Sequence, residues 1–165
     1  MTALNTYSTA RAYAQSAFAM MIGDARISLQ NDLTFFLSFH LLIGFSMELY
    51  LKTVLLHQGV SEKTLKSFEF RHNLRNLYEE AKSKGFYATD CEVLVSYLHE
   101  KHKAHEFRYM KDDASYDAMR LDYVFDILSA VDVAVDKLIG ARALHGLDSD
   151  GAWNFPTDRA MWRYS

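Results

Sequence analysis

Two histidines, an arginine and a tyrosine follow one another closely in the second half of the chain, as His102, His105, Arg108 and Tyr109. A helix would bring His102, His105 and Tyr109 to one face, which continues the face that the leucines upstream turn toward the core. Arg108 would lie one step to the side. Imidazoles transfer protons near neutral pH and a guanidinium holds phosphate oxygens, so this set could act on a phosphodiester or hold a nucleotide phosphate. Two buried core histidines would produce the same pattern.

A second polar feature is a stripe at steps of four along an apolar stretch, made of His40, Gly44, Glu48 and Lys52. Residues four apart share one face of a helix. An unpaired buried carboxylate is costly, so Glu48 should pair with Lys52 or with a basic group from another helix. The stripe is either an internal ion pair that fixes the helix register or part of a polar cleft that binds a ligand.

Metal binding is the rival chemistry for these histidines. His99, His102, His105 and Glu106 could bring ligands to one side of a helix, and Glu69 and His72 form one Glu-x-x-His element. Di-iron helical bundles use that element twice, and the second copy is missing here. Cys91 is the single cysteine and gives no zinc pattern. We therefore predict no bound metal and no cofactor.

The motifs of several large enzyme classes are absent. The chain has no Gly-x-x-x-x-Gly-Lys, no Gly-x-Gly-x-x-Gly and no Gly-x-Ser-x-Gly. These elements build the common phosphate loops and the hydrolase nucleophile elbow. A P-loop NTPase, a dinucleotide-dependent dehydrogenase and an α/β-hydrolase are excluded.

The elements that must position these residues are helices. With 165 residues, 50% of them hydrophobic and only one proline, the chain suits one densely packed helical domain. Apolar periodicity predicts helices over 6–29, 33–56, 72–84, from 89 or 90 to about 108, and 114–138. Asn5 or Thr6 should cap the first, and Gly59, Gly85 and Gly140 should follow the second, third and fifth. We predict an all-α, up-and-down bundle of about five helices, with the second at its centre.

The C-terminal tail and the last helix carry two further predictions. Residues 1–140 should form the bundle, and 141–165 should form an aromatic tail, with Trp153, Phe155, Trp162 and Tyr164, that packs on the domain or on a partner subunit. The last helix carries an acidic arc, which we interpret as solvated surface rather than as a cation-binding or partner-docking site. The members of this arc are Asp122, Asp126, Asp132 and Asp136.

Charge and composition bear on partners and compartment. The formal net charge of −3 gives no global attraction to nucleic acid or anionic lipid, so any such contact must be local. Residues 33–47 carry no Asp, Glu, Lys or Arg but are fewer than the roughly 18–20 apolar residues of a membrane span, which favours a buried core helix and no membrane. The lone Cys91 and a start without basic residues predict a cytoplasmic protein.

Three short motifs resemble the HEPN superfamily. They are Glu-Leu-Tyr-Leu-Lys at 48–52, His-Asn-Leu at 72–74 and Arg-Tyr at 108–109, within a match over roughly 40–110. The resemblance implies a dimeric helical bundle of prokaryotic defence, toxin-antitoxin or nucleotidyltransferase-associated systems. It marks Glu48, Lys52, His72, Arg108 and Tyr109 as ligand-binding positions. Many members are metal-independent ribonucleases with Arg-x(4–6)-His, a motif that this sequence lacks.

Three hypotheses for function follow. The leading one is a HEPN-like homodimer that binds a nucleotide or nucleic acid in a polar cleft near the dimer interface. The first alternative is a metal-independent endoribonuclease that uses His102, His105 and Arg108. The second is an antitoxin-like or adaptor module that docks on a nucleotidyltransferase or toxin partner through its tail.

Overall fold

The fold is all-α, as predicted. A computed structural model describes residues 1–23, 33–109 and 117–142, and it contains no strand within those ranges. Its elements are α1 (Ala3–Ile22), α3 (Leu33–His57), α4 (Glu62–Leu65), α5 (Leu74–Ser83), α6 (Cys91–Lys103), the one-turn 3₁₀ helix η1 (Glu106–Arg108) and α7 (Leu121–Ile139).

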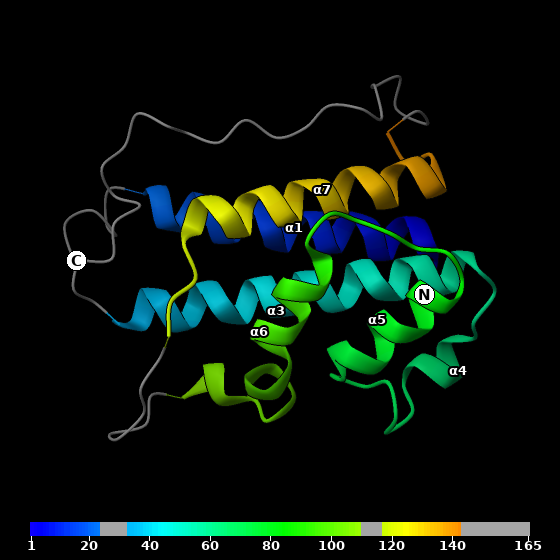
Figure 1. The fold of residues 1–165 in the computed structure, drawn as a ribbon, viewed down its shortest axis with the longest axis horizontal. Coiled ribbons are helices and arrows are strands. Elements are labelled where there is room, and N and C mark those ends of the chain that lie inside the picture. Colours follow the sequence, from blue (N-terminus) through cyan, green and yellow to red (C-terminus); the bar gives the residue numbers. More distant parts are fainter. Residues whose placement is uncertain (24–32, 110–116, 143–165) are drawn as a thin grey trace.

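Helix α3 lies at the centre of the bundle, as predicted. The long helices α1, α3 and α7 pack against one another, whereas α5, α6 and η1 also pack on α3 and lie below it in Figure 1. In that view α6 runs across α3 rather than alongside it. An apolar surface nearly all round a helix needs neighbours on several sides, and Phe39, Ile43, Met47, Tyr50 and Leu51 of α3 are fully buried.

Helix α3 has the length and the apolar composition of a candidate membrane span. Within the described ranges, Phe35–His57 is the one stretch that is long and apolar enough to cross a bilayer by length and composition. Most of it is buried inside the fold, and the core helices of soluble proteins meet the same criteria. The charge-free stretch 33–47 is too short to cross a bilayer, whereas the whole of α3, which contains this stretch, is long enough.

Helix α1 begins earlier than expected. Thr2, not Asn5 or Thr6, is the N-cap, and its hydroxyl oxygen accepts a hydrogen bond from the Asn5 backbone N–H at 3.2 Å. Thr6 lies inside the helix, where its hydroxyl donates to the Thr2 carbonyl oxygen at 2.7 Å. The local capping interaction therefore favours a start one turn nearer the N-terminus. The predicted end of this helix near 29 lies outside the described residues.

Helix α6 is shorter than predicted. It ends at Lys103, and His105 adopts a left-handed backbone conformation with φ 57°, after which η1 begins. A left-handed residue interrupts a right-handed helix, so the face expected to carry His102, His105 and Tyr109 together does not exist. A second difference is α4, one helical turn within the connector. By contrast, Gly85 and Gly140 follow α5 and α7 as expected.

The prediction that the acidic arc of α7 is solvated surface is wrong for two of its four aspartates. Asp132 and Asp136 are fully buried, whereas Asp126 is exposed and Asp122 is partly exposed. The Tyr50 hydroxyl donates to Asp132 Oδ1 at 2.8 Å, and the Arg142 guanidinium pairs with the same carboxylate. These partners make burial of the charge tolerable. Ala141 and Arg142, the first two residues of the predicted tail, are buried, and 143–165, with the four tail aromatics, lie outside the described residues.

Candidate functional site

The Glu48 carboxylate of α3 is the meeting point of three polar side chains. Lys52 Nζ lies 2.5 Å from Glu48 Oε1, while His72 Nδ1 and His102 Nε2 lie 2.9 Å and 2.8 Å from Oε2. Glu48 is only 3% exposed, so its charge depends on these donors rather than on water. We call Glu48, Lys52, His72 and His102 the Glu48 cluster.

Three separate parts of the fold supply the cluster. Glu48 and Lys52 are one turn apart on α3, and His102 stands in the last turn of α6. His72 precedes Asn73, whose side chain caps α5 by accepting the Asn76 backbone N–H at 3.1 Å. The backbone of His72 is left-handed, with φ 59°. Non-glycine residues in this conformation are strained and concentrate at functional sites.

Packing fixes the orientation of the two imidazoles. The Phe45 ring lies edge-on to both, with centroids 5.2 Å from His102 and 6.1 Å from His72. His102 is buried, whereas the side chain of His72 is 25% exposed. One imidazole of the cluster is therefore enclosed and the other can meet a ligand.

Electrostatics keep Glu48 ionised. Burial alone would raise its pKa, but the hydrogen bond from His102, the charge and hydrogen bond of Lys52 and the hydrogen bond from His72 lower the pKa to about 2. An ionised carboxylate accepts and does not donate, so each histidine donates its N–H to Oε2. In the neutral form of the His72 ring, Nε2 would then carry the lone pair that a general base needs.

His105 lies next to His72 although it is not on the same helical face as His102. The two rings are perpendicular with centroids 4.9 Å apart. Burial and the charge of Arg108, followed by His72, His102 and Arg71, lower the pKa of His105. Arg71 and Arg108 therefore stand within electrostatic range of the paired imidazoles, and both are exposed.

The remaining predicted site residues lie further out. Arg108 contributes its charge at this surface, and no contact among the described residues joins its guanidinium to Glu48. Tyr109 is 76% exposed and is likewise not part of the cluster. Glu48, Lys52, His72 and His102 are thus brought together, His105 and Arg108 lie beside them, and Tyr109 stands apart.

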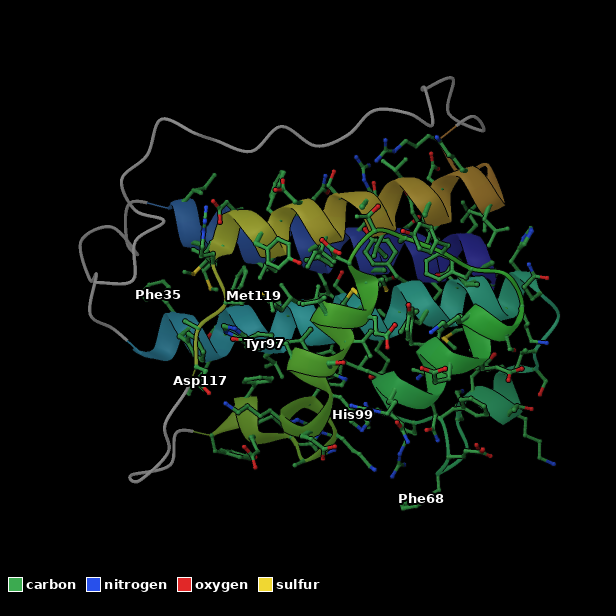
Figure 2. The ribbon with its side chains drawn as sticks, viewed as in Figure 1. Phe35, Phe68, Tyr97, His99, Asp117 and Met119 are labelled. Atoms are coloured by element: carbon green, nitrogen blue, oxygen red, sulfur yellow. The ribbon has the colours of Figure 1, made fainter. Side chains whose placement is uncertain are left out.

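Two further exposed cations, Arg75 and Lys103, lie in the segments that also carry His72 and His105. Both act on His99, which is a neighbour of His102 on α6. We call Arg71, Arg75, Lys103 and Arg108 the basic rim. Phe68, in the loop before α5, is 93% exposed and points away from the body of the fold in Figure 2.

Two of the residues considered for metal binding have other positions. His99 Nδ1 accepts the Arg75 backbone N–H at 3.3 Å, at the start of α5, and Figure 2 shows this histidine on α6. Glu69, of the Glu-x-x-His element, is exposed. The group whose ligand atoms do converge is Glu48, His72 and His102, with all three atoms within 4.8 Å of one another. Sequence spacing could not find this set, because its members are 24 and 54 residues from Glu48.

His40 belongs to a separate network, so the predicted stripe on α3 divides into two parts. His40 Nδ1 donates to the Phe36 carbonyl oxygen, and Nε2 lies 2.7 Å from the Tyr97 hydroxyl. That hydroxyl also contacts the backbone of Asp117 and Met119, just before α7, as the grouping in Figure 2 shows. Burial lowers the pKa of His40 to about 4, so this ring is neutral at pH 7.

No protein-family model, curated protein or solved structure matches this chain.

Proposed function

We propose that this protein binds a phosphate-bearing ligand, a nucleotide or RNA, on the surface around His72 and His105. The observation that carries the proposal is the perpendicular pairing of these two partly exposed imidazoles, 4.9 Å apart, within range of the Arg71 and Arg108 charges. Guanidinium groups hold phosphate oxygens in pairs of hydrogen bonds. Imidazoles next to them donate to, or accept from, the same group.

Local charge supports an anionic ligand although the whole chain is slightly acidic. Residues 68–75 and 99–109 together contain five Lys or Arg against three Glu, and four of the seven histidines of the chain. The buried Lys52 is not available to a ligand, because Glu48 already holds it at 2.5 Å. The cations that a phosphate would meet are therefore those of the basic rim.

Exposed aromatic rings support a nucleic-acid or nucleotide ligand over a bare anion. Phe68 and Tyr109 are 93% and 76% exposed, in the two segments that also carry Arg71 and Arg108. Bases stack on such rings without sequence preference, and each stacked base contributes about 1–3 kcal/mol. The combination of cations with unburied aromatics is the usual composition of a single-strand binding surface.

The resemblance to the HEPN superfamily favours the same class of ligand. It extends the proposal to a homodimer in a prokaryotic defence or toxin-antitoxin type system, with a nucleotidyltransferase or toxin as the partner protein. Light scattering coupled to size exclusion measures the oligomeric state directly, and a mass of one chain at micromolar concentration contradicts the dimer.

Binding to a short fluorescent RNA and to a panel of nucleotides, followed by anisotropy, tests the proposal. The Arg71→Ala/Arg108→Ala variant should bind at least about tenfold more weakly and show a smaller dependence on salt, because two phosphate contacts are lost. Lys82→Ala/Lys84→Ala is the matched control, since it removes the same charge from the opposite end of α5. Equal loss in both variants, or loss in neither, contradicts a site at the basic rim.

A ribonuclease is the second candidate, and one observation favours it. The Glu48 carboxylate holds His72 by Nδ1, so the Nε2 side of this ring is oriented and lies next to a second partly exposed imidazole, His105. Two such histidines can share general acid and base roles in transphosphorylation of RNA. His102, the partner expected from the sequence, is buried, which makes His72 the better candidate.

The corresponding assay is cleavage of RNA in EDTA. His105→Ala should reduce the rate about 100-fold or more, as expected for a lost general acid or base. His57→Ala, at the exposed end of α3, is the control. RNA that stays intact with the unmodified chain excludes a metal-independent nuclease and leaves the binding proposal standing.

A further inference from the structure

We propose that Glu48, His72 and His102 form a binding site for a divalent transition metal ion, with zinc as the reference ion. The ligand atoms are Glu48 Oε2, His72 Nδ1 and His102 Nε2, which all lie within 4.8 Å of one another. The inference does not depend on the proposed function, because the ion should bind in the absence of RNA or nucleotide.

The distances in the metal-free arrangement are close to those that a bound ion requires. Zinc binds histidine nitrogen and carboxylate oxygen at about 2.0–2.2 Å, which separates tetrahedral ligand atoms by about 3.3 Å. Both nitrogens now lie 2.8–2.9 Å from Glu48 Oε2 and no more than 4.8 Å from each other, so the shifts that an ion requires are on the order of 1 Å.

The surroundings of the three ligands are those of a supported metal site. Lys52 holds Oε1 of Glu48 at 2.5 Å and leaves Oε2 free to bind an ion. Metal-binding carboxylates and imidazoles are usually fixed in this way by outer hydrogen bonds and packing. Phe45 packs edge-on against both rings, so the ligand side chains are already ordered before an ion arrives.

The donor set indicates the class of ion and leaves one position open. Two imidazoles and one carboxylate bind zinc in hydrolytic enzymes and iron(II) in non-haem oxygenases, whereas magnesium and calcium prefer oxygen ligands alone. The fourth position would be taken by water or by His105, whose ring lies 4.9 Å from that of His72. Of the three ligands, His72 is the one that solvent reaches, with its side chain 25% exposed.

Charge and proton balance are compatible with an ion. Each histidine now donates an N–H to Glu48, and the ion would replace both of these protons. A neutral ring moves its proton to the other ring nitrogen, and a charged ring releases one to solvent. Lys52, Arg71 and Arg108 oppose a cation. Water screens the two exposed arginines, and the buried Lys52 stands on Oε1, the carboxylate oxygen that does not bind the ion, whereas the three ligand atoms contact the ion directly.

Titration of the purified full chain with Co²⁺, followed by its visible absorption, and competition of Zn²⁺ with a chromophoric chelator measure the site. We expect one ion per chain and at least about tenfold weaker binding in His72→Asn. Asparagine suits this variant because it tolerates the left-handed backbone of residue 72 better than most residues do. His57→Asn, which removes an exposed histidine of α3, should bind as the unmodified chain does.

Two results overturn the inference. One is the absence of saturable binding by the unmodified chain, and the other is unchanged binding in His72→Asn. Histidine NMR resonances give a readout that needs no variant. Zinc should shift the ring signals of His72 and His102 and leave those of His57 in place, and a shift confined to other histidines contradicts the site.

Discussion

Gly44 and His102 are in contact across the α3 and α6 packing, and the contact leaves no room for a side chain on residue 44. A Cβ atom at Gly44 would stand 2.5 Å from His102 Nδ1, closer than real Cβ contacts allow. The imidazole cannot move away freely, since its Nε2 is hydrogen-bonded to Glu48 at 2.8 Å and Phe45 packs against the ring. The glycine thus determines how closely α6 approaches α3.

The first prediction is that Gly44→Ala destabilises the protein. Alanine in a helix normally stabilises by roughly 0.5–1 kcal/mol relative to glycine, and overpacking in a core costs about 1–3 kcal/mol. Here overpacking should dominate, with a net loss of about 1–2 kcal/mol in urea unfolding. Gly23→Ala is the control, because its nearest atoms lie at an ordinary 3.4 Å. A stability for Gly44→Ala equal to or above that of the unmodified chain contradicts this contact.

The second prediction concerns the buried ion pair. Lys52 and Glu48 are 7% and 3% exposed, so Lys52→Met leaves the buried Glu48 carboxylate without the positive charge that pairs with it. Breaking such a pair on one side costs about 3–5 kcal/mol, whereas replacing both partners costs less. Lys52→Met should therefore be more destabilising than Lys52→Met/Glu48→Gln. Chemical unfolding of both variants measures the difference, and a double variant that is the less stable of the two contradicts the pairing.

The part of the Glu48 cluster that is local in sequence could be predicted, and the rest could not. Glu48 and Lys52 are four apart on one helix, so their pairing follows from helical geometry. His72 reaches Glu48 only because its backbone is left-handed, and His102 does so because α6 crosses α3. Neither condition leaves a periodic signal in the sequence.

The difference between local pattern and distant contacts also explains which predictions about the helices were confirmed and which were wrong. The central position of α3 and the ends at Gly85 and Gly140 depend on local pattern, and all were predicted. The residues around His105 suit a helix, so the sequence pattern predicted a helix beyond the true end of α6. The left-handed backbone of His105, which prevents this continuation, leaves no signal in that pattern. For Asp132, the partner Tyr50 is 82 residues away in the chain, and a helical wheel of α7 alone could not reveal it.

The third prediction tests that partner. Tyr50 is fully buried, and its hydroxyl donates to Asp132 Oδ1 at 2.8 Å. Tyr50→Phe keeps the ring but removes one donor from a buried carboxylate, which should cost about 1.5–3 kcal/mol of stability. Tyr87→Phe, at a residue that is 77% exposed, should change stability by less than about 0.5 kcal/mol. Thermal unfolding compares the two, and equal effects contradict a structural role for the buried carboxylate.

The fourth prediction is a loss of stability in mild acid through His40. Burial lowers the pKa of this histidine from 6.5 to about 4, against an opposing effect of the hydrogen bond to the Phe36 carbonyl, and the charge of Lys101 on α6 lowers it slightly further. Between those two values the unfolded chain binds a proton that the folded chain does not bind. Stability due to the neutral ring is therefore present above pH 6.5 and is lost as the pH falls toward 4.

The size of this loss, on the order of 3 kcal/mol, follows from the shift because the ring is almost completely buried. Urea unfolding at a series of pH values should show a smaller loss for His40→Gln, which can still hydrogen-bond Tyr97, than for the unmodified chain. A remainder is expected in the variant, because the pKa values of His99 and His105 are lowered as well. Glu48 contributes only at the acid end of this range, since the stability due to its low pKa is lost below about 4.5, as the pH falls toward 2. His57→Gln should keep the full slope, because His57 is exposed. An unchanged slope between pH 6.5 and 4 in His40→Gln would assign the acid sensitivity to another group.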